Sequence, residues 1–292
     1  MSHTAPTRRE FLQAAAATAF TPLVLSAATP TSPSPSRRPW KWAPEPGLWE
    51  TQCGNDVVAQ LHVAADAGFA AFADPWMMRN STAEQDDFAL AASIRGIVLG
   101  PAQHCWDPFP STNAIFDEMA RIGVAWRNQS IANAFLFNRL TTSDGRRRVV
   151  QSLNRSVPRT APIVMLVEPL VTDLAHRDWY EWFAEIVHEV NHPLCRLSVD
   201  TYRLAAAGMD VVDYLHRHAS ILGHVELADF PGGYEPGSGT LDIDGIIAAT
   251  ALSPFEGVIG LRCGLSQPSV AGLSRLIAAA RRHHGLREAV LA

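Results

Sequence analysis

The sequence predicts an α/β fold, a (β/α)8 barrel, from two observations. Short apolar runs alternate with segments whose apolar residues recur three or four positions apart, which is the spacing of a helix with one buried face. Eight such pairs follow one another within about 250 residues, as a barrel of eight parallel strands requires. A doubly wound open sheet also alternates strands and helices, but no G-x-G-x-x-G follows an early run.

The apolar runs bounded by turn-forming residues are the expected strands. They are residues 48–53, 68–75, 94–101, 123–129, 162–170, 195–202, 223–230 and 257–263. Helices are expected between them at 55–67, 82–93, 111–122, 143–156, 175–190, 209–219, 242–251 and 267–284. Because active chemistry in such a barrel lies at the carboxyl ends of the strands, the last residues of each run are the candidates for a functional site.

Residues 1–39 are expected to lie outside the barrel domain, which would span 40–292. The segment 7–13 reads TRREFLQ and precedes an apolar run and three small residues, which predicts a twin-arginine export signal over 1–28. The apolar run at 14–25 is too short to span a membrane comfortably. Residues 29–39, seven of which are Pro or Ser, indicate a flexible tether. The expected location is therefore periplasmic or extracellular, with the cleavage site left open.

Composition narrows the kind of partner. A net charge of −5, a pI near 6.1 and a single lysine, Lys41, argue against a nucleic-acid groove or an anionic membrane surface. A small neutral or anionic metabolite is the expected partner, and a homo-oligomer is left open. The four cysteines have no C-x-x-C spacing, which argues against a zinc ribbon. A Cys53–Cys263 disulfide is left open beside the alternative of free thiols, since strands one and eight are neighbours in a closed barrel.

Carboxylates lie on three successive predicted strands. Glu168 and Asp200 end the fifth and sixth runs, and Glu226 lies in the seventh. A lone carboxylate in a barrel mouth is costly unless a cation or a hydrogen-bond donor satisfies it. Because oxygen ligands from adjacent strands suit Mg²⁺ or Mn²⁺, the three side chains are candidate metal ligands.

The stretch from 223 to 242 combines a strand with a long glycine-rich loop. Alternation places His224 and Glu226 on one face of the strand, and the glycines and prolines after it favour a loop that covers a ligand. His224, Asp229 and Glu235 are therefore candidate substrate contacts. From strand three, His104 is a candidate proton carrier or pocket wall, and Trp106 a candidate apolar wall.

At these residues the chain resembles the hydroxypyruvate isomerase family of the xylose-isomerase-like TIM barrels. The resemblance rests on Val-Glu-Pro at 167–169, Asp-Thr-Tyr at 200–202 and above all GHVELADFPG at 223–232 with EPGSG at 235–239. It implies a divalent metal, Mg²⁺ or Mn²⁺, held by residues matching Glu168, Asp200 and Glu226. It also implies isomerisation by proton transfer between a pair of glutamates on strands five and eight. The residue of this chain that matches the strand-five glutamate is Glu168.

The chain departs from that pattern on strand eight, where the expected glutamate is Arg262, and on strand seven, where Glu226 replaces an imidazole or amide. An arginine can neither bind a metal nor act readily as a base. Two readings stay open: Arg262 pairs with a carboxylate beside the metal or clamps a substrate carboxylate, or it takes the place of the metal. The expected function is an exported isomerase or epimerase acting on a small sugar or hydroxy-carbonyl compound. The alternatives are a lyase, a hydrolase or a non-catalytic binding protein.

Overall fold

The computed structural model describes residues 40–105, 114–123, 125–126, 128–132, 143–159, 161–169, 177–255, 257–267 and 270–283. The chain divides into two compact units, Met1–Ser34 and Pro35–Ala292, and every described residue belongs to the second. The predicted export signal and tether, and Trp106, therefore lie outside the described residues. Within the described ranges, every helix is too short or too polar to cross a membrane.

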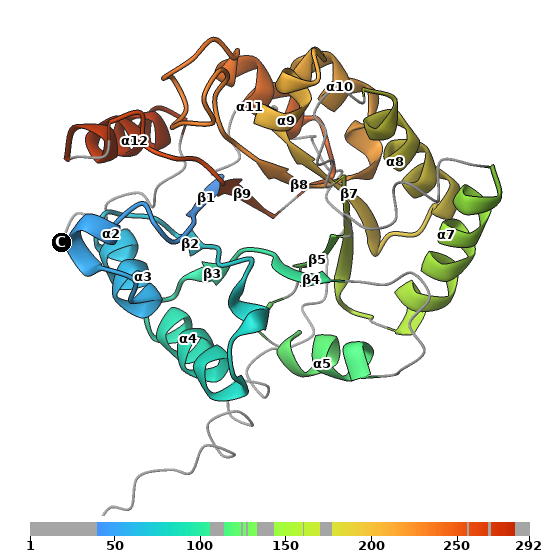
Figure 1. The fold of residues 1–292 in the computed structure, drawn as a ribbon, viewed down its shortest axis with the longest axis horizontal. Helices are drawn as coiled ribbons and strands as arrows, with labels where there is room; N and C mark the ends of the chain where they lie inside the picture. Colours follow the sequence, from blue (N-terminus) through green and yellow to red (C-terminus); the bar gives the residue numbers. More distant parts are fainter. Residues whose placement is uncertain are drawn as a thin grey trace, which may run out of the picture. The chain divides into compact units, whose positions relative to one another are not determined.

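Parallel strands form the centre of the molecule (Figure 1). The larger sheet has the order β1-β9-β8-β7-β6-β5-β4, and β2 and β3 form a second parallel pair. The strands are β1 (Lys41–Pro44), β2 (Ala71–Phe72), β3 (Val98–Leu99), β4 (Ala102–Cys105), β5 (Asn128–Ala132), β6 (Val164–Glu168), β7 (Cys195–Asp200), β8 (Leu222–Glu226) and β9 (Val258–Leu261).

The pair β2 and β3 closes the ring between β1 and β4. The backbone N–H of Ala73 donates to Pro44 O at 3.0 Å, and that of Gln103 donates to Pro75 O at 3.1 Å. β3 and β4 are two halves of one barrel strand, separated only by Gly100 and Pro101. Counted in this way the barrel has eight parallel strands, which confirms the predicted fold class.

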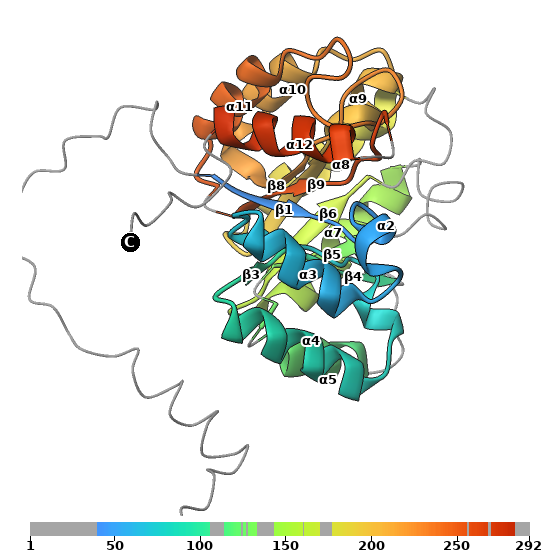
Figure 2. The same cartoon turned by 90° about the vertical axis from the view of Figure 1, so that its left-hand side faces the viewer.

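Helices surround the strands in both views (Figures 1 and 2). They are α2 (Glu50–Cys53), α3 (Val57–Asp66), α4 (Thr82–Ile94), α5 (Ala114–Ile122), α7 (Ser143–Ser156), α8 (Arg177–Val190), α9 (Thr201–Ala206), α10 (Val211–Arg217), α11 (Ile243–Ala251) and α12 (Val270–Arg282). Short 3-10 turns are η2 (Met77–Arg79), η3 (Val157–Arg159) and η4 (Ala219–Ile221).

The helices begin where the sequence supplies a cap and bury the face that their spacing predicts. Ser81 and Glu84 form a reciprocal capping box at the start of α4, which satisfies backbone donors that the first turn leaves without partners. The same helix buries Phe88, whose ring stacks on Trp126 at 6.2 Å between centroids. The eight helical segments predicted from the sequence are thus confirmed at α3, α4, α5, α7, α8, α10, α11 and α12.

The first strand was predicted wrongly. Residues 48–53 are not a strand: β1 is Lys41–Pro44, the chain turns at Gly47 with φ of 102°, and Glu50–Cys53 is the short helix α2. Leu48 and Trp49 are apolar because they pack into the core from a loop, where the Trp49 ring meets Phe69 edge-on at 5.9 Å. The residue that follows strand one in the barrel mouth is therefore Glu45.

Strands three and four are shifted from their predicted bounds. The third strand ends at Cys105 rather than near 101, so His104 lies on the strand itself. Asn128 and Gln129, which the prediction placed at the end of strand four, begin β5, and Ala132 pairs with Glu168 at its carboxyl end. The remaining strands lie within the predicted runs to within one residue.

Candidate functional site

The strand registers bring acidic side chains from separate strands to one level of the barrel. Asp200 at the end of β7 pairs with Glu226 at the end of β8, and Glu226 pairs with Gly260 on β9. Arg262 directly follows β9. The carboxyl ends of the strands therefore place several carboxylates around one arginine.

Arg262 is the centre of this cluster. Its Nη1 donates to Glu168 Oε1 at 2.7 Å and lies 2.6 Å from Glu226 Oε2, while its Nε donates to Glu45 Oε1 at 3.2 Å. Burial disfavours the charged guanidinium, but Glu226 and Glu168 outweigh this effect and raise the pKa of Arg262 well above its usual value. The arginine is thus a permanent cation shared by three glutamates.

Both oxygens of Glu168 are occupied. Oε1 accepts from Arg262, and Oε2 accepts from Nε2 of Gln103 on β4 at 3.2 Å. Only 3% of the Glu168 side chain is exposed. The carboxylate predicted to act as the base is therefore held from two sides by the protein itself.

Asp200 and Glu226 are neighbours, but their pKa values are shifted in opposite directions. Asp200 caps α9, accepting from the Arg203 backbone N–H at 2.9 Å, and its Oδ2 lies 3.3 Å from Arg203 Nε. Burial and then the charge of Glu226 raise the pKa of Asp200 to about 6. Burial acts in the same direction on Glu226, but Arg262 and His224 outweigh it and lower the pKa of Glu226.

The observed arrangement does not fit the metal ion predicted for Glu168, Asp200 and Glu226. Carboxylate oxygens lie about 2.0 to 2.6 Å from bound Mg²⁺ or Ca²⁺. The space between Glu168 and Glu226 is taken by Nη1 of Arg262, at 2.7 and 2.6 Å. No set of three or more His, Cys, Asp or Glu in the described part of the chain is arranged to hold a metal. A metal on these carboxylates stays a prediction that requires Arg262 to move.

His224 lies one inward position below Glu226 on β8. It is 1% exposed, its Nε2 lies 3.6 Å from Glu226 Oε1, and neither ring nitrogen hydrogen bonds to a described residue. A Cβ at Gly260 would come within 3.1 Å of Nε2, so the glycine on β9 leaves the room for this ring. The histidine supports Glu226 from inside the barrel, and its predicted contact with a substrate stays a prediction.

The glycine-rich loop is folded around its own carboxylates. Fully buried Asp229 accepts from four backbone N–H groups, and they belong to Phe230, Gly237, Gly239 and Leu241. Fully buried Glu235 accepts from the backbone and hydroxyl of Ser266, both at 2.7 Å, and from Arg275 at 2.9 Å. Because both side chains are fully buried and bonded within the protein, the predicted contact of Asp229 or Glu235 with a substrate stays a prediction.

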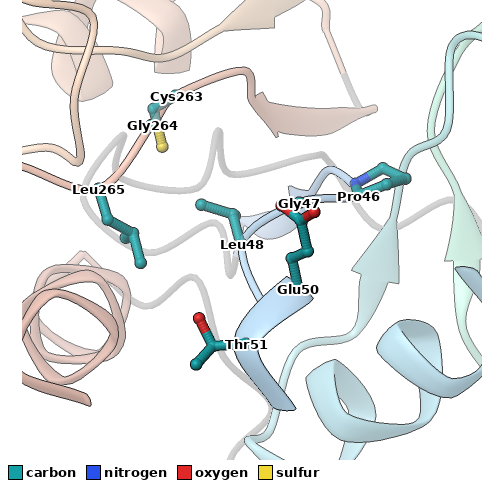
Figure 3. Close-up of a pocket in the computed structure, with 8 residues that line it drawn as sticks. All are labelled: Pro46, Gly47, Leu48, Glu50, Thr51, Cys263, Gly264 and Leu265. Atoms are coloured by element: carbon teal, nitrogen blue, oxygen red, sulfur yellow. The ribbon is translucent and has the colours of Figure 1, made fainter. Parts of the chain in front are cut away.

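A pocket of about 410 Å³ opens beside the cluster (Figure 3). Its walls are the residues that follow Glu45 and those that follow Arg262: Pro46, Gly47, Leu48, Glu50, Thr51, Cys263, Gly264 and Leu265. Cys263 and Cys53 are free thiols, so the disulfide left open between them is absent from the structure. Burial raises the pKa of the Cys263 thiol, which makes it an unreactive part of the wall.

The sequence did not predict Glu45 and Gln103 as members of this site. The side chains of His104 and Trp106, which it did predict, lie outside the described residues. Glu45 was missed because strand one was misplaced, and Gln103 because strand three was ended too early. A strand beginning at Trp40 would have revealed Glu45 as its mouth residue. His104 lies on β4, but its side chain, like all of Trp106, is outside the described residues.

The fold and site define a TIM barrel whose mouth holds a buried cluster of carboxylates and one arginine. A model of the xylose isomerase-like TIM barrel family matches residues 61–283, and the chain belongs to this family.

A relative with a printed name matches part of this chain. A Streptomyces coelicolor protein named "Putative hydroxypyruvate isomerase" is 33% identical over 87 residues, which is 30% of this chain and 31% of that protein. This chain therefore matches less than a third of that relative's length.

Solved structures share the fold at low identity. An AP endonuclease of family 2 from Brucella melitensis has a TM-score of 0.65 at 16% identity, covering 82% of this chain and 98% of its own. D-psicose 3-epimerase from Clostridium cellulolyticum, solved with D-tagatose, has a TM-score of 0.65 at 15% identity, covering 84% and 99%. IolI, solved with a zinc atom, has 0.59 at 14%, covering 83% and 96%.

Proposed function

We propose that the barrel mouth catalyses proton transfer next to the carbonyl group of a small neutral hydroxy-carbonyl compound, such as a sugar, with Arg262 as its cation. One observation carries the proposal: a buried guanidinium shared by three glutamates, beside an open pocket of about 410 Å³. The isomerase and epimerase named among the similar proteins support the same class of reaction.

The chemistry needs a base and a fixed positive charge. Removing a proton from the carbon beside a carbonyl group moves negative charge onto the carbonyl oxygen, and a cation already in place stabilises that charge. A carboxylate accepts the proton. Arg262 supplies the charge without a metal, and the carboxylates around it supply candidate bases.

The charge balance favours a neutral substrate. In the described part of the chain, the arginines that face Glu168, Glu226 and Asp200 are Arg262 and Arg203, and Glu45 adds a fourth carboxyl group. A substrate carboxylate would compete with three glutamates for the same guanidinium. A sugar presents only hydroxyl and carbonyl groups, so it meets no such repulsion.

A second function, binding of a sugar without turnover, is favoured by Glu168. Arg262 and Gln103 occupy both of its oxygens, so the carboxylate expected to take the proton is not free in this arrangement. A binding protein would gain from such a rigid and satisfied site.

Solvent-deuterium exchange distinguishes the two. The purified protein is incubated in D2O with D-fructose or D-tagatose, or with the anion hydroxypyruvate for comparison, with and without EDTA. Loss of the C–H signal beside the carbonyl is followed by proton NMR. Exchange of a sugar that persists in EDTA supports the proposal. Exchange that requires added Mg²⁺ or Mn²⁺ would show that a bound metal ion, and not Arg262, supplies the positive charge. Stabilisation of the protein by a sugar without any exchange supports the binding function.

A further inference from the structure

Glu45 and Arg262 stand side by side because of the barrel's closure. In the parallel pairing of β1 with β9, Pro44 lies opposite Leu261, so the next residues along the two strands are Glu45 and Arg262. Their side chains meet at 3.2 Å between Oε1 and Nε, although 217 positions separate them in the chain. A carboxylate is thus present at the level of strand eight, but it belongs to strand one.

Glu45 is more accessible to a ligand than the carboxylates behind it. The Glu45 and Arg262 side chains are 15% and 22% exposed, compared with 3% for Glu168. The chain segments that line the pocket of about 410 Å³ begin at the residues directly after Glu45 and Arg262. Neither Glu45 nor Arg262 lines this pocket, but both side chains adjoin the residues that do, and both are more exposed than Glu168.

The hydrogen bonding of Glu45 leaves it able to react. Its Oε1 is paired with Arg262, and its Oε2 has no hydrogen-bond partner among the described residues. Glu168, in contrast, uses both oxygens within the protein. A carboxylate oxygen without a hydrogen bond to the protein is what a proton acceptor requires.

We infer that Glu45 is the catalytic base of this site, supplying from strand one the carboxylate that strand eight lacks, while Glu168 positions Arg262. The inference rests on the proposed function. The C–H bond beside the substrate carbonyl breaks, and its electron pair forms the double bond of an enolate whose oxygen faces Arg262. The proton forms the O–H of Glu45 and returns to carbon when the bond reforms, so no oxidant or reductant is needed.

The electrostatics of Glu45 agree with that role. Burial is the main cause that raises its pKa to about 8, partly offset by Arg262. A base whose pKa lies near the working pH combines a usable ionised fraction with strong proton affinity. The exchange rate is therefore expected to rise with pH through about 8.

The test measures deuterium exchange of D-fructose and D-tagatose from pH 6 to 9. Glu45→Gln is expected to lower the rate by about 10²-fold or more and to remove the rise near pH 8. Glu168→Gln is expected to keep that rise, even where its rate falls. Glu118→Gln, on the outer helix α5, is the control and should match the unmodified protein in rate and pH profile.

A second variant guards against loss of folding. Glu45→Ala with added sodium formate should regain exchange in proportion to formate, because the small acid can occupy the vacated place and accept the proton. An unchanged rate and pH profile in Glu45→Gln, or rescue by formate of Glu168→Ala but not of Glu45→Ala, overturns the inference. Absence of exchange in the unmodified protein with every compound overturns the proposed function itself, so the two failures are distinguishable.

Discussion

At the scale of single residues, Arg262 and its glutamates depend on one another. A buried guanidinium is tolerated because Glu168, Glu226 and Glu45 surround it, and Glu168 and Glu226 are tolerated in the barrel because the guanidinium is there. The arginine at 262 therefore determines the electrostatic surroundings of all three glutamates.

Removing the charge of Arg262 should be strongly destabilising. Arg262→Met leaves two buried glutamates without their cation, and breaking a buried pair in this way typically costs about 3 to 5 kcal/mol. The control is Arg282→Met, since Arg282 and Asp244 are exposed by 72% and 66% and such a surface pair contributes at most about 1 kcal/mol. Urea unfolding of both variants measures the difference, and equal losses would show that the Arg262 contacts contribute little.

Reversing the charge should create a metal site. Arg262→Glu places a fourth carboxylate beside Glu168, Glu226 and Glu45 and removes their cation. We expect the melting temperature of this variant to rise with added Mn²⁺, because oxygen ligands converge and only the folded state binds the ion. The unmodified protein should show a much smaller shift. A similar shift in both proteins would mean that the metal binds elsewhere or displaces Arg262 unaided.

The sequence predicted some members of this cluster and not others for a physical reason. Glu168, Asp200 and Glu226 end strands that are recognisable as apolar runs, and Arg262 follows another. Glu45 follows a strand of only four residues, Lys41–Pro44, which starts with a charge and ends with a proline. Short edge-like sequences of this kind become strands through pairing with β9, a contact that local patterns do not encode.

At the scale of elements, the loop between β8 and α11 was predicted to cover a ligand, but the structure shows it wrapped around Asp229. Gly239 lies so close that a Cβ there would be 2.3 Å from Phe230 O and 2.6 Å from Asp229 Oδ1. Glycine is thus required by the loop's own internal bonds. A glycine-rich loop can either cover a ligand or fold around its own side chains, so composition alone does not distinguish these two structures.

Gly239→Ala should therefore loosen the loop and destabilise the fold. The added methyl group meets backbone atoms that must shift, and forced overpacking of this kind costs about 1 to 3 kcal/mol. Ser238→Ala is the matched control, because Ser238 is exposed and its replacement should change stability by less than about 0.5 kcal/mol. Thermal unfolding measures both, and an unchanged melting temperature for Gly239→Ala would show that the loop readily rearranges.

At the scale of the whole molecule, the charge cluster joins the first strand of the barrel to the last. Glu45 follows β1 and Arg262 follows β9, the strands whose pairing closes the ring. Ionisation of Glu45 therefore acts on the contact that closes the fold. Eight strand-helix pairs were enough to predict that the barrel closes. The side chains that closure brings together depend on the strand register, and because strand one was misplaced by a few residues, the contact of Glu45 with Arg262 was not predicted.

This placement gives a prediction for stability against pH. In the folded protein the pKa of Glu45 is raised to about 8 from an ordinary value of 4.5, so between these values the folded state holds a proton that the unfolded chain releases. The stabilisation is complete below about pH 4.5 and is lost as pH rises through about 8, by up to about 1.4 kcal/mol for each unit of pKa difference. Glu45→Gln cannot ionise, so its unfolding free energy relative to the unmodified protein should increase steadily from pH 5 to pH 8. Urea unfolding across this range measures the difference between the two proteins. A constant difference would mean that Glu45 is already ionised in the folded barrel, and that its pairing with Arg262 outweighs its burial.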